Sequence, residues 1–213
     1  MITNASSLTL GTLRQTFGLR FDTSDRFFDE WLNNSPTLTE VELQGLDRLT
    51  RNYTYLSQEE PPLEEIVKLV VVSPLLDLAG FYQFPFLVKA EVSTNLDVAD
   101  EDNTISVQGR IDILVIQDSF WILVIESKPS RLDVTAGIPQ ALTYLLTAPK
   151  LQASCYGMLT NGREVLFLKC DRHQSVPQYT RSPTYRLLEN KAERIQVLQG
   201  LKQIGTYIGN FKY

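Results

Sequence analysis

Hydrophobic side chains in the middle of the sequence form two runs that a short polar stretch separates. The runs cover 109–116 and 121–128 and are rich in β-branched and aliphatic residues, so they predict adjacent antiparallel strands. Folding the chain back about the polar stretch sets Asp112 opposite Glu126. Lys128 shares a face with Glu126 because side chains alternate along a strand. Burying an unpaired charge is costly, so these three charged groups must be paired or bound to a metal.

Apolar residues at helical spacing predict the helices that flank these strands. The first helix begins at the Pro61-Pro62 pair, carries Glu64 and Glu65 in its first turn, and is expected to bend or end at Pro74. The expected order is a helix from 61, strands over 84–92, 109–116 and 121–128, a helix over 139–146, strands over 153–159 and 164–169, and a helix over 191–208. The sequence therefore predicts an α/β fold.

Residues 1–60 precede this pattern and are predicted to be helical. Aromatic residues between 27 and 31 share one helical face, and Thr37 with Glu40 has the spacing of a capping box that opens a second helix. The segment is short for an independent core. We therefore expect a helical N-terminal elaboration over 1–60 that packs on a core domain over 61–213.

Composition narrows the class of protein. A chain of 213 residues with 43% hydrophobic residues can form one domain with a sizeable core. It has no 18-residue apolar run and no signal-like amino terminus, which predicts a cytoplasmic protein with no membrane span. Cys155 and Cys170 are too few for a disulfide scaffold and are expected in the core. His173 is the only histidine and is expected at the surface, so a two-histidine zinc mechanism is excluded.

Charge is unevenly spread over the sequence. The net charge is −5, but residues 163–213 hold nine Lys and Arg against four Asp and Glu. Basic residues interleaved with Tyr179 and Tyr185 could follow a phosphate backbone and stack on bases, whereas a solvated surface is the alternative that composition favours. The basic residues in question are Arg172, Arg181, Arg186, Lys191 and Arg194.

Asp112, a spacer, and Glu126-x-Lys128 on the next strand form a pattern that resembles the PD-(D/E)XK nuclease superfamily. Downstream, Gln140 and Tyr144 are similar to the QxxxY element of the RecB-like branch and of type I restriction-subunit nuclease domains. Their spacing of four residues puts both side chains on one helix face.

Two further segments extend the resemblance to about residues 62–170. Residues 156–162 are similar to the strand that closes in a Thr-Asn-Gly turn in those domains. Upstream, 64–68 and 73–81 are similar to their first core helix, which carries an acidic residue. Together the segments occur in the order that the family has, on the expected types of element.

The resemblance implies a restriction-endonuclease-like core in which a central mixed sheet is flanked by helices in the order α-β-β-β-α-β. It implies metal-dependent hydrolysis of DNA phosphodiester bonds, with Asp112, Glu126 and Lys128 as catalytic residues. Asp112 and Glu126 would hold Mg2+, with Mn2+ as a substitute, because magnesium prefers carboxylate oxygens. Glu64 is the expected third metal ligand from the helix, and Glu65 is its rival.

Partners and alternatives follow from the same residues. Gln140 and Tyr144 would contact the substrate, DNA is the expected partner, and a homodimer is compatible with this class. No GxxxxGK loop occurs, so any motor or specificity subunit would be a separate chain. One alternative is a nucleic-acid-binding module that keeps the fold without turnover. Another is a regulatory interaction protein in which the charged cluster is a structural ion pair, which the acidic net charge favours.

Overall fold

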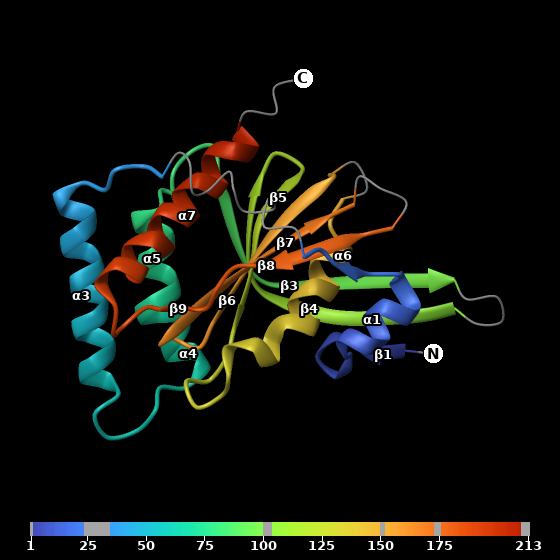
Figure 1. The fold of residues 1–213 in the computed structure, drawn as a ribbon, viewed down its shortest axis with the longest axis horizontal. Coiled ribbons are helices and arrows are strands. Elements are labelled where there is room, and N and C mark those ends of the chain that lie inside the picture. The colour runs from blue at the N-terminus through green and yellow to red at the C-terminus, as the bar shows by residue number, and fades with distance from the viewer. Residues whose placement is uncertain (1, 24–34, 100–103, 150–151, 173–175, 210–213) are drawn as a thin grey trace.

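The computed structural model describes residues 2–23, 35–99, 104–149, 152–172 and 176–209 (Figure 1). Its N-terminal part comprises β1 (Ile2–Asn4), the 3-10 turn η1 (Ala5–Ser7), α1 (Leu10–Phe17), β2 (Arg20–Phe21) and α3 (Glu40–Leu56). Then follow α4 (Glu64–Val67), the π-helical turn η3 (Lys68–Val72), α5 (Ser73–Leu78), β3 (Leu87–Ala99), β4 (Thr104–Gln117), β5 (Phe120–Ser127), η4 (Val134–Gly137), α6 (Ile138–Leu146), β6 (Ser154–Thr160), β7 (Glu164–Asp171), β8 (Gln178–Arg181), β9 (Tyr185–Arg186) and α7 (Lys191–Gly209).

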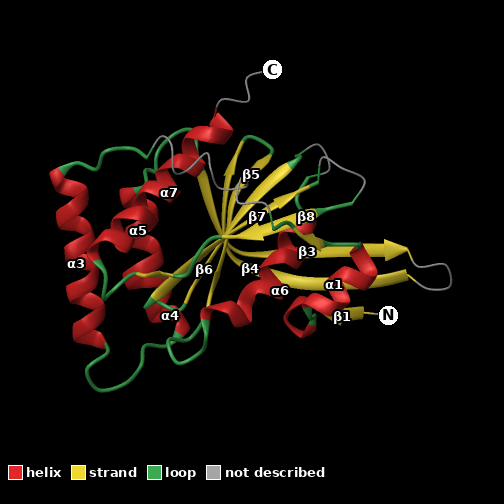
Figure 2. Ribbon diagram, viewed as in Figure 1, coloured by secondary structure: helices red, strands yellow, loops and turns green. Residues whose placement is uncertain are grey.

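The strands of the described residues form one nine-stranded mixed sheet (Figure 2). Its main path runs β1-β4-β5-β6-β7-β8-β2, with β3 paired to β4 and β9 paired to β7. The pairs β1 with β4, β5 with β6, and β2 with β8 are parallel, and the others are antiparallel. The expected α/β class, with a central mixed sheet flanked by helices, is confirmed at this level.

Helices cover the sheet on both faces, with a separate apolar core on each. Figure 1 shows α3, α5 and α7 on one side and α1 and α6 on the other. Alternation along β5 divides its side chains between the cores: Leu123 and Ile125 face α5 and α7, and Val124 faces α6. Glu126, two residues after Val124, therefore belongs to the α6 face.

The hairpin of β4 and β5 has the register that the sequence predicts. Ile113 pairs with Ile125, and Val115 pairs with Leu123, so the strands fold about residue 119. A bulge after Val115 shifts the last pairs by one residue. The shift lies beyond the charged end of the hairpin and leaves the alignment of that end intact.

The helix that begins at Glu64 differs from the prediction at Pro74. The chain stays helical through α4, η3 and α5 to Leu78. Pro74 lies in the first turn of α5, directly after the π-helical turn. At this change of helix type the regular α-helical hydrogen bonding is already interrupted, so a proline, which has no backbone N–H, is accommodated. The following strand begins at Leu87, not at residue 84, because the Phe86 N–H closes a turn on the Gln83 carbonyl.

The N-terminal segment is not wholly helical, which corrects the prediction for 1–60. β1 and β2 join the sheet, and strands of two or three residues are too short to show a period. The capping box of α3 is formed by Thr39 and Glu42, not by Thr37 and Glu40, since the sequence holds two overlapping candidates. The predicted aromatic face over 27–31 lies outside the described residues.

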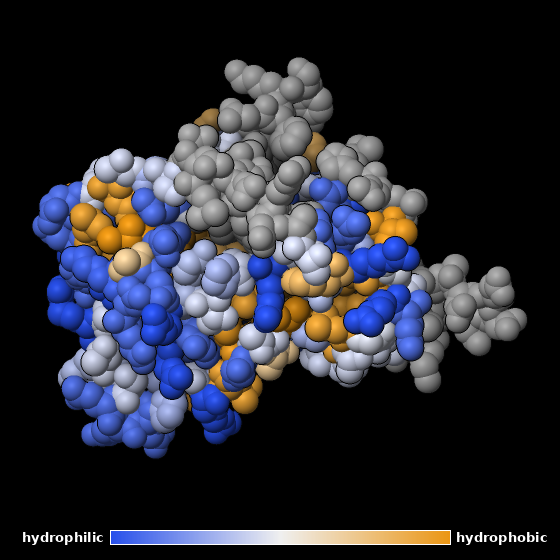
Figure 3. Space-filling view, in the orientation of Figure 1, coloured by the Kyte–Doolittle hydropathy of each residue, from blue (hydrophilic) through white to orange (hydrophobic). Residues whose placement is uncertain are grey.

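Buried side chains of α3 lie in the same apolar core as the sheet. Leu46, Leu49 and Tyr53 pack with residues of α5, β5 and α7. Figure 3 shows hydrophilic side chains over most of the face that carries α3, with small apolar areas among them. The helix thus has one face in the core and one in solvent, as an amphipathic helix requires.

Candidate active site

The charged end of the β4–β5 hairpin brings Asp112, Glu126 and Lys128 together. The Lys128 Nζ lies 2.6 Å from Glu126 Oε1. Asp112 Oδ2 accepts hydrogen bonds from the backbone N–H of Ser127 at 2.7 Å and from its hydroxyl at 3.2 Å. The Lys128 N–H donates to the Thr160 carbonyl of β6, which extends the pairing past the strand end and fixes the lysine backbone.

Helix α6 adds a hydrogen-bonded chain that starts at the lysine. The Lys128 ammonium donates to Gln140 Oε1 at 2.9 Å, and Gln140 Nε2 donates to the Tyr144 hydroxyl at 2.9 Å. That hydroxyl donates in turn to the Arg110 carbonyl of β4 at 3.0 Å. Gln140 and Tyr144 therefore face the charged cluster, while Leu142 and other apolar residues of α6 are buried in the core.

The first core helix contributes Glu64 together with a lysine that the sequence analysis did not single out. The Lys68 Nζ lies 3.0 Å from Glu64 Oε1, 3.2 Å from Asp112 Oδ1 and 3.4 Å from Glu91 Oε1. Glu65 is exposed, so Glu64 is the helical carboxylate at the site. From sequence, Lys68 four residues after Glu64 reads as an ordinary surface pair on a helix.

Glu91 is a second residue that the sequence analysis missed. It lies in β3 with a φ of 57°, in the left-handed region that residues other than glycine rarely adopt. Its Oε2 pairs with the Arg110 Nε at 2.5 Å, and its Oε1 faces Lys68. Such backbone strain persists only where surrounding contacts hold it, and it is often found at functional sites. The only sequence signal was an acidic residue within an apolar strand.

Electrostatics single out Glu126. Burial, reinforced by the nearby charge of Asp112, raises the pKa of Glu126 to about 7, although Lys128 opposes the shift. Its second oxygen, Oε2, is buried and has no hydrogen-bond partner among the described residues. An unsatisfied buried carboxylate oxygen carries a desolvation cost that a protein ligand has not offset.

The pKa values of Lys68 and Tyr144, which also belong to the site, are raised as well. Burial alone would lower the pKa of Lys68, but its hydrogen bond to Glu64 and the charge of Asp112 raise it above its usual value. Burial raises the pKa of the Tyr144 phenol, which keeps its proton available for the Arg110 carbonyl. Lys68 is thus a fixed positive charge, and Tyr144 is a fixed donor.

The donor set suits a hard divalent cation in its chemistry. Glu64, Asp112 and Glu126 offer carboxylate oxygens, which magnesium and manganese prefer, and no described residue pairs with Glu126 Oε2. Within the described ranges, however, no group of three or more acidic, His or Cys side chains is arranged to hold a metal ion. The carboxylates instead surround the two ammonium groups, Lys68 and Lys128.

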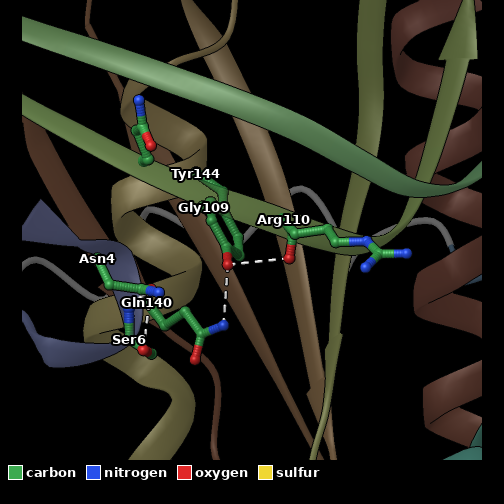
Figure 4. Close-up of a pocket in the computed structure, with 7 residues that line it drawn as sticks. Asn4, Ser6, Gly109, Arg110, Gln140 and Tyr144 are labelled. Carbon is green, nitrogen blue, oxygen red and sulfur yellow. Dashed lines mark hydrogen bonds between the residues drawn. The ribbon is translucent and has the colours of Figure 1, made fainter.

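A pocket of about 330 Å³ lies beside the cluster (Figure 4). It opens where β4 passes from its pairing with β1, which ends at Gln108, to its pairing with β5, which begins at Ile113. Figure 4 shows Gln140 and Tyr144 pointing toward one another and the Arg110 side chain pointing away from them. The pocket is lined by Asn4, Ser6, Gln108, Gly109, Arg110, Gln140 and Tyr144. Most of these residues carry an amide or a hydroxyl group.

Most of the C-terminal basic residues that could follow a phosphate backbone make contacts within the fold, whereas Arg181 is exposed. The Arg172 guanidinium donates to four backbone carbonyls around the end of α6. Arg194 is buried and bound to Asp47, to which Lys191 also pairs, and Arg186 pairs with Glu193. These side chains are engaged within the fold, because helix ends and neighbouring carboxylates supply acceptors that the sequence does not reveal.

Three further predictions have different outcomes. Cys155 and Cys170 are buried free thiols that pair directly across β6 and β7, as expected for core residues. His173 lies outside the described residues. None of the helices in the described ranges is long and apolar enough to cross a membrane.

Comparisons with known proteins add little. No family model and no curated protein matches the chain. Among solved structures, it is similar to the crystal structure of SSO0001, with 18% identity, a TM-score of 0.32 and coverage of 84% of this chain and 83% of that chain. A similarity at that identity and TM-score carries no argument about fold family or activity. Any functional conclusion therefore rests on the geometry of the site.

Proposed function

We propose that the protein is a metal-dependent nuclease that hydrolyses DNA phosphodiester bonds and has a restriction-endonuclease-like core. One observation carries the proposal: the Lys128 ammonium joins Glu126 of β5 to Gln140 of α6, beside Asp112 of β4. Residues from three elements that the sequence resemblance names separately thus meet at one point. The succession of a helix, three strands, a helix and a strand from Glu64 to Thr160 gives further support.

In this proposal, Glu64, Asp112 and Glu126 hold Mg2+ or Mn2+ through their carboxylate oxygens. The bound metal would supply a Lewis acid that stabilises charge on the phosphate and activates water near neutral pH. Lys128 orients the attacking water and offsets negative charge on the phosphate, and Gln140 keeps the ammonium in place by accepting its hydrogen bond. The buried Tyr144 hydroxyl accepts a hydrogen bond from Gln140 Nε2 and so fixes the orientation of the amide.

The neighbouring pocket is where we propose that a nucleotide next to the cleaved bond lies. Its amide and hydroxyl groups both donate and accept hydrogen bonds, as base edges and sugars require. Gln140 belongs to the pocket and to the lysine environment at once, so a nucleotide there is adjacent to Lys128. Arg172, Arg186 and Arg194 near the C-terminus are held in intramolecular contacts, so we assign DNA contact to this side of the sheet.

The proposal is tested by incubating the protein with linear and circular DNA in Mg2+, in Mn2+ and in EDTA. We expect cleavage that requires metal and that Asp112→Ala abolishes. Glu64→Gln should reduce cleavage at least about tenfold, whereas Glu65→Gln, its exposed neighbour, should leave cleavage unchanged. Wild-type protein that neither cuts nor binds DNA in either metal would contradict the proposal.

Lys128→Ala separates catalysis from metal binding. The lysine is not among the proposed metal ligands, so the variant should lose cleavage and keep the rise in melting temperature that Mn2+ causes. Glu126→Gln should lose both, because it removes a ligand charge. Equal metal responses in these two variants would be evidence against the assigned roles.

The alternative is a regulatory protein in which the cluster only stabilises the fold. The observation that favours it is the pairing of Lys68 with Glu64, Asp112 and Glu91, which offsets part of their negative charge without a metal. This alternative predicts that neither Mg2+ nor Mn2+ changes the melting curve. The metal titrations below therefore distinguish the two functions.

A further inference from the structure

The ammonium group of Lys68 has the surroundings that a bound cation would have. Carboxylate oxygens of Glu64, Asp112 and Glu91 lie 3.0, 3.2 and 3.4 Å from its Nζ. These residues come from α4, β4 and β3, which converge on the lysine from separate parts of the fold. Only 20% of the Lys68 side chain is exposed, so the ion pairs are partly shielded from water. Lys68 is therefore a firmly held positive charge inside the acidic cluster.

Both oxygens of Asp112 are already engaged. Its Oδ2 accepts from the Ser127 N–H and hydroxyl, and its Oδ1 faces Lys68. A metal ion that binds Asp112 must take Oδ1, because losing the Ser127 N–H bond would leave a backbone donor without its partner. Glu64 presents its Oε1 to the same ammonium. The metal and Lys68 would thus compete for the same two oxygen atoms.

A second observation points to a missing cation. Glu126 is 2% exposed and its Oε2 has no partner in the described part of the chain, although Asp112 and Glu64 are close enough for their charges to raise its pKa. Lys68 satisfies the other two carboxylates and does not pair with Glu126 in the described contacts. The carboxylates are therefore arranged around the lysine and not around a common metal position.

From these contacts, we infer that Lys68 is a tethered competitor of the divalent metal. In the metal-free protein, its ammonium occupies the acidic cluster; when the metal binds, it takes Asp112 Oδ1 and Glu64 Oε1 from the lysine. This inference rests on the proposed function, since it concerns the same metal ligands. It adds that Lys68 sets the metal affinity of the site, because the metal must displace its ammonium group.

Glu91 gives the displaced ammonium a place to go. It is the third partner of Lys68 and is not one of the proposed metal ligands. The Arg110 Nε holds its carboxylate at 2.5 Å, and its backbone is fixed in the left-handed region within β3. Lys68 can therefore keep one ion pair when it leaves Asp112 and Glu64. The exchange does not leave an unpaired positive charge in a partly buried site.

The exchange is tested by titrating metal-free protein with Mn2+ alone, followed by calorimetry. Lys68→Met keeps most of the aliphatic stem and removes the charge, so we expect its Mn2+ affinity to exceed that of the wild type by about tenfold or more. Lys68→Arg keeps the charge and should stay within about threefold of the wild type. Lys89→Met, which removes an exposed charge of β3, is the matched control and should also stay within about threefold.

Lysine labelling provides a second measurement that needs no variant. An amine-acylating reagent, with detection by mass spectrometry, should modify Lys68 several-fold faster in saturating Mn2+, while Lys89 should be unaffected. Labelling of Lys68 that is unchanged or slower in Mn2+ would overturn the inference, even if Lys68→Met failed to fold.

The outcomes separate this inference from the proposed function. A wild type that binds Mn2+ together with a Lys68→Met variant that binds no tighter would overturn the competition and leave the nuclease proposal intact. A wild type without measurable binding beside a variant that binds would support the competition. If neither protein bound Mn2+, the proposed metal site and the inference would both fail.

Discussion

At the scale of single residues, Glu126 is the acidic residue of the site whose pKa is shifted most clearly. Its carboxyl is buried in the α6 face of the sheet. One oxygen contacts Lys128, and the other has no partner within the ranges that the structure describes. Burial and the charge of Asp112 raise its pKa to about 7 from a usual value near 4.5. The folded protein therefore favours the protonated form more strongly than the unfolded chain does.

The metal-free protein should consequently lose stability as the pH rises. Because the folded pKa lies above the unfolded one, the stabilising contribution is complete below about pH 4.5 and is lost as the pH passes through about 7. Glu126→Gln cannot ionise, so relative to wild type its stability should be higher at pH 8 than at pH 5 by on the order of 1 to 3 kcal/mol. Urea unfolding in EDTA at both pH values measures this difference.

Glu65→Gln is the control, since Glu65 is exposed and lies just outside the cluster. It should follow the wild-type pH dependence. If Glu126→Gln lost as much stability between pH 5 and pH 8 as the wild type, ionisation of Glu126 would not be the cause.

Strand parity grouped three residues from the sequence and helix periodicity placed two more on one helix face, whereas the family resemblance implied that this face meets the charged cluster. Asp112, Glu126 and Lys128 follow from the fold-back of one hairpin, and Gln140 with Tyr144 follows from i, i+4 spacing. Lys68 and Glu91 could not be grouped in this way. Their meeting depends on where a helix and β3 cross the sheet, which is a long-range property, and Glu91 also requires a strained backbone.

At the scale of elements, α6 and β4 meet where β4 lacks a strand partner on one edge. The Tyr144 hydroxyl supplies a donor to the Arg110 carbonyl there, and its ring packs against the backbone at Gly109. A Cβ at Gly109 would lie 2.5 Å from a Tyr144 ring carbon and 2.9 Å from the Ala5 Cβ. The absence of a side chain at this position is what allows helix, strand and η1 to come together.

Gly109→Ala should therefore destabilise the protein by about 1 to 3 kcal/mol and shift Tyr144. Gly157→Ala is a milder comparison, because its Cβ would meet the flexible end of Leu145 at 3.3 Å. Thermal unfolding of the two variants, with tyrosine fluorescence as a second readout, makes the comparison. Equal melting temperatures for Gly109→Ala and the wild type would show that the close packing at β4 relaxes without cost.

Arg172 links the end of β7 to the end of α6. Its two terminal nitrogens donate to the carbonyls of Leu146, Ala148, Pro149 and Gln152. Arg172→Met removes these donors and leaves partly buried carbonyls unsatisfied, so we expect a loss of about 2 to 4 kcal/mol in chemical denaturation. Arg181→Met, at an exposed position of β8, should change stability by less than about 0.5 kcal/mol. Similar losses in both would contradict the structural role of Arg172.

The sequence predicted the apolar parts of the long elements. It did not predict the extension of β3 to Ala99 or the start of β4 at Thr104, which are polar, or the short and irregular elements. β5, β6 and α6 have enough apolar residues to show a period, and their bounds lie within about two residues of the expected ones. β1 and β2 depend on pairing with β4 and β8 for their existence. The π-helical turn lies directly before Pro74, and its Val71 and Val72 pack in the core.

At the scale of the whole molecule, α3 supports the loop that follows Lys128. The Tyr53 hydroxyl donates to the Ser130 hydroxyl at 2.6 Å, and the Ser130 N–H donates to the Pro62 carbonyl. The Tyr53 ring also packs against Gly162, which has a φ of 86° and no room for a Cβ. Helix α3, the residues just before α4 and the turn between β6 and β7 thus meet at the loop that follows Lys128.

Tyr53→Phe should lower the free energy of unfolding by about 1 kcal/mol, because it removes a buried hydrogen bond and keeps the ring. It should also speed hydrogen exchange at Ser130, whose loop loses an anchor. Tyr55→Phe, at an exposed position on the same helix, is the control and should change neither quantity. Unaltered exchange at Ser130 in Tyr53→Phe would mean that α3 does not hold the loop.

Cys155 of β6 and Cys170 of β7 lie opposite each other and can report when these strands open. Both thiols are buried, and burial raises the pKa of Cys155 to about 11 and that of Cys170 further still, so neither presents a thiolate while the sheet is closed. A thiol-specific dye can therefore react only after the central strands separate. The rate of its reaction would measure how often β6 and β7 open at the cysteine pair, with no engineered probe.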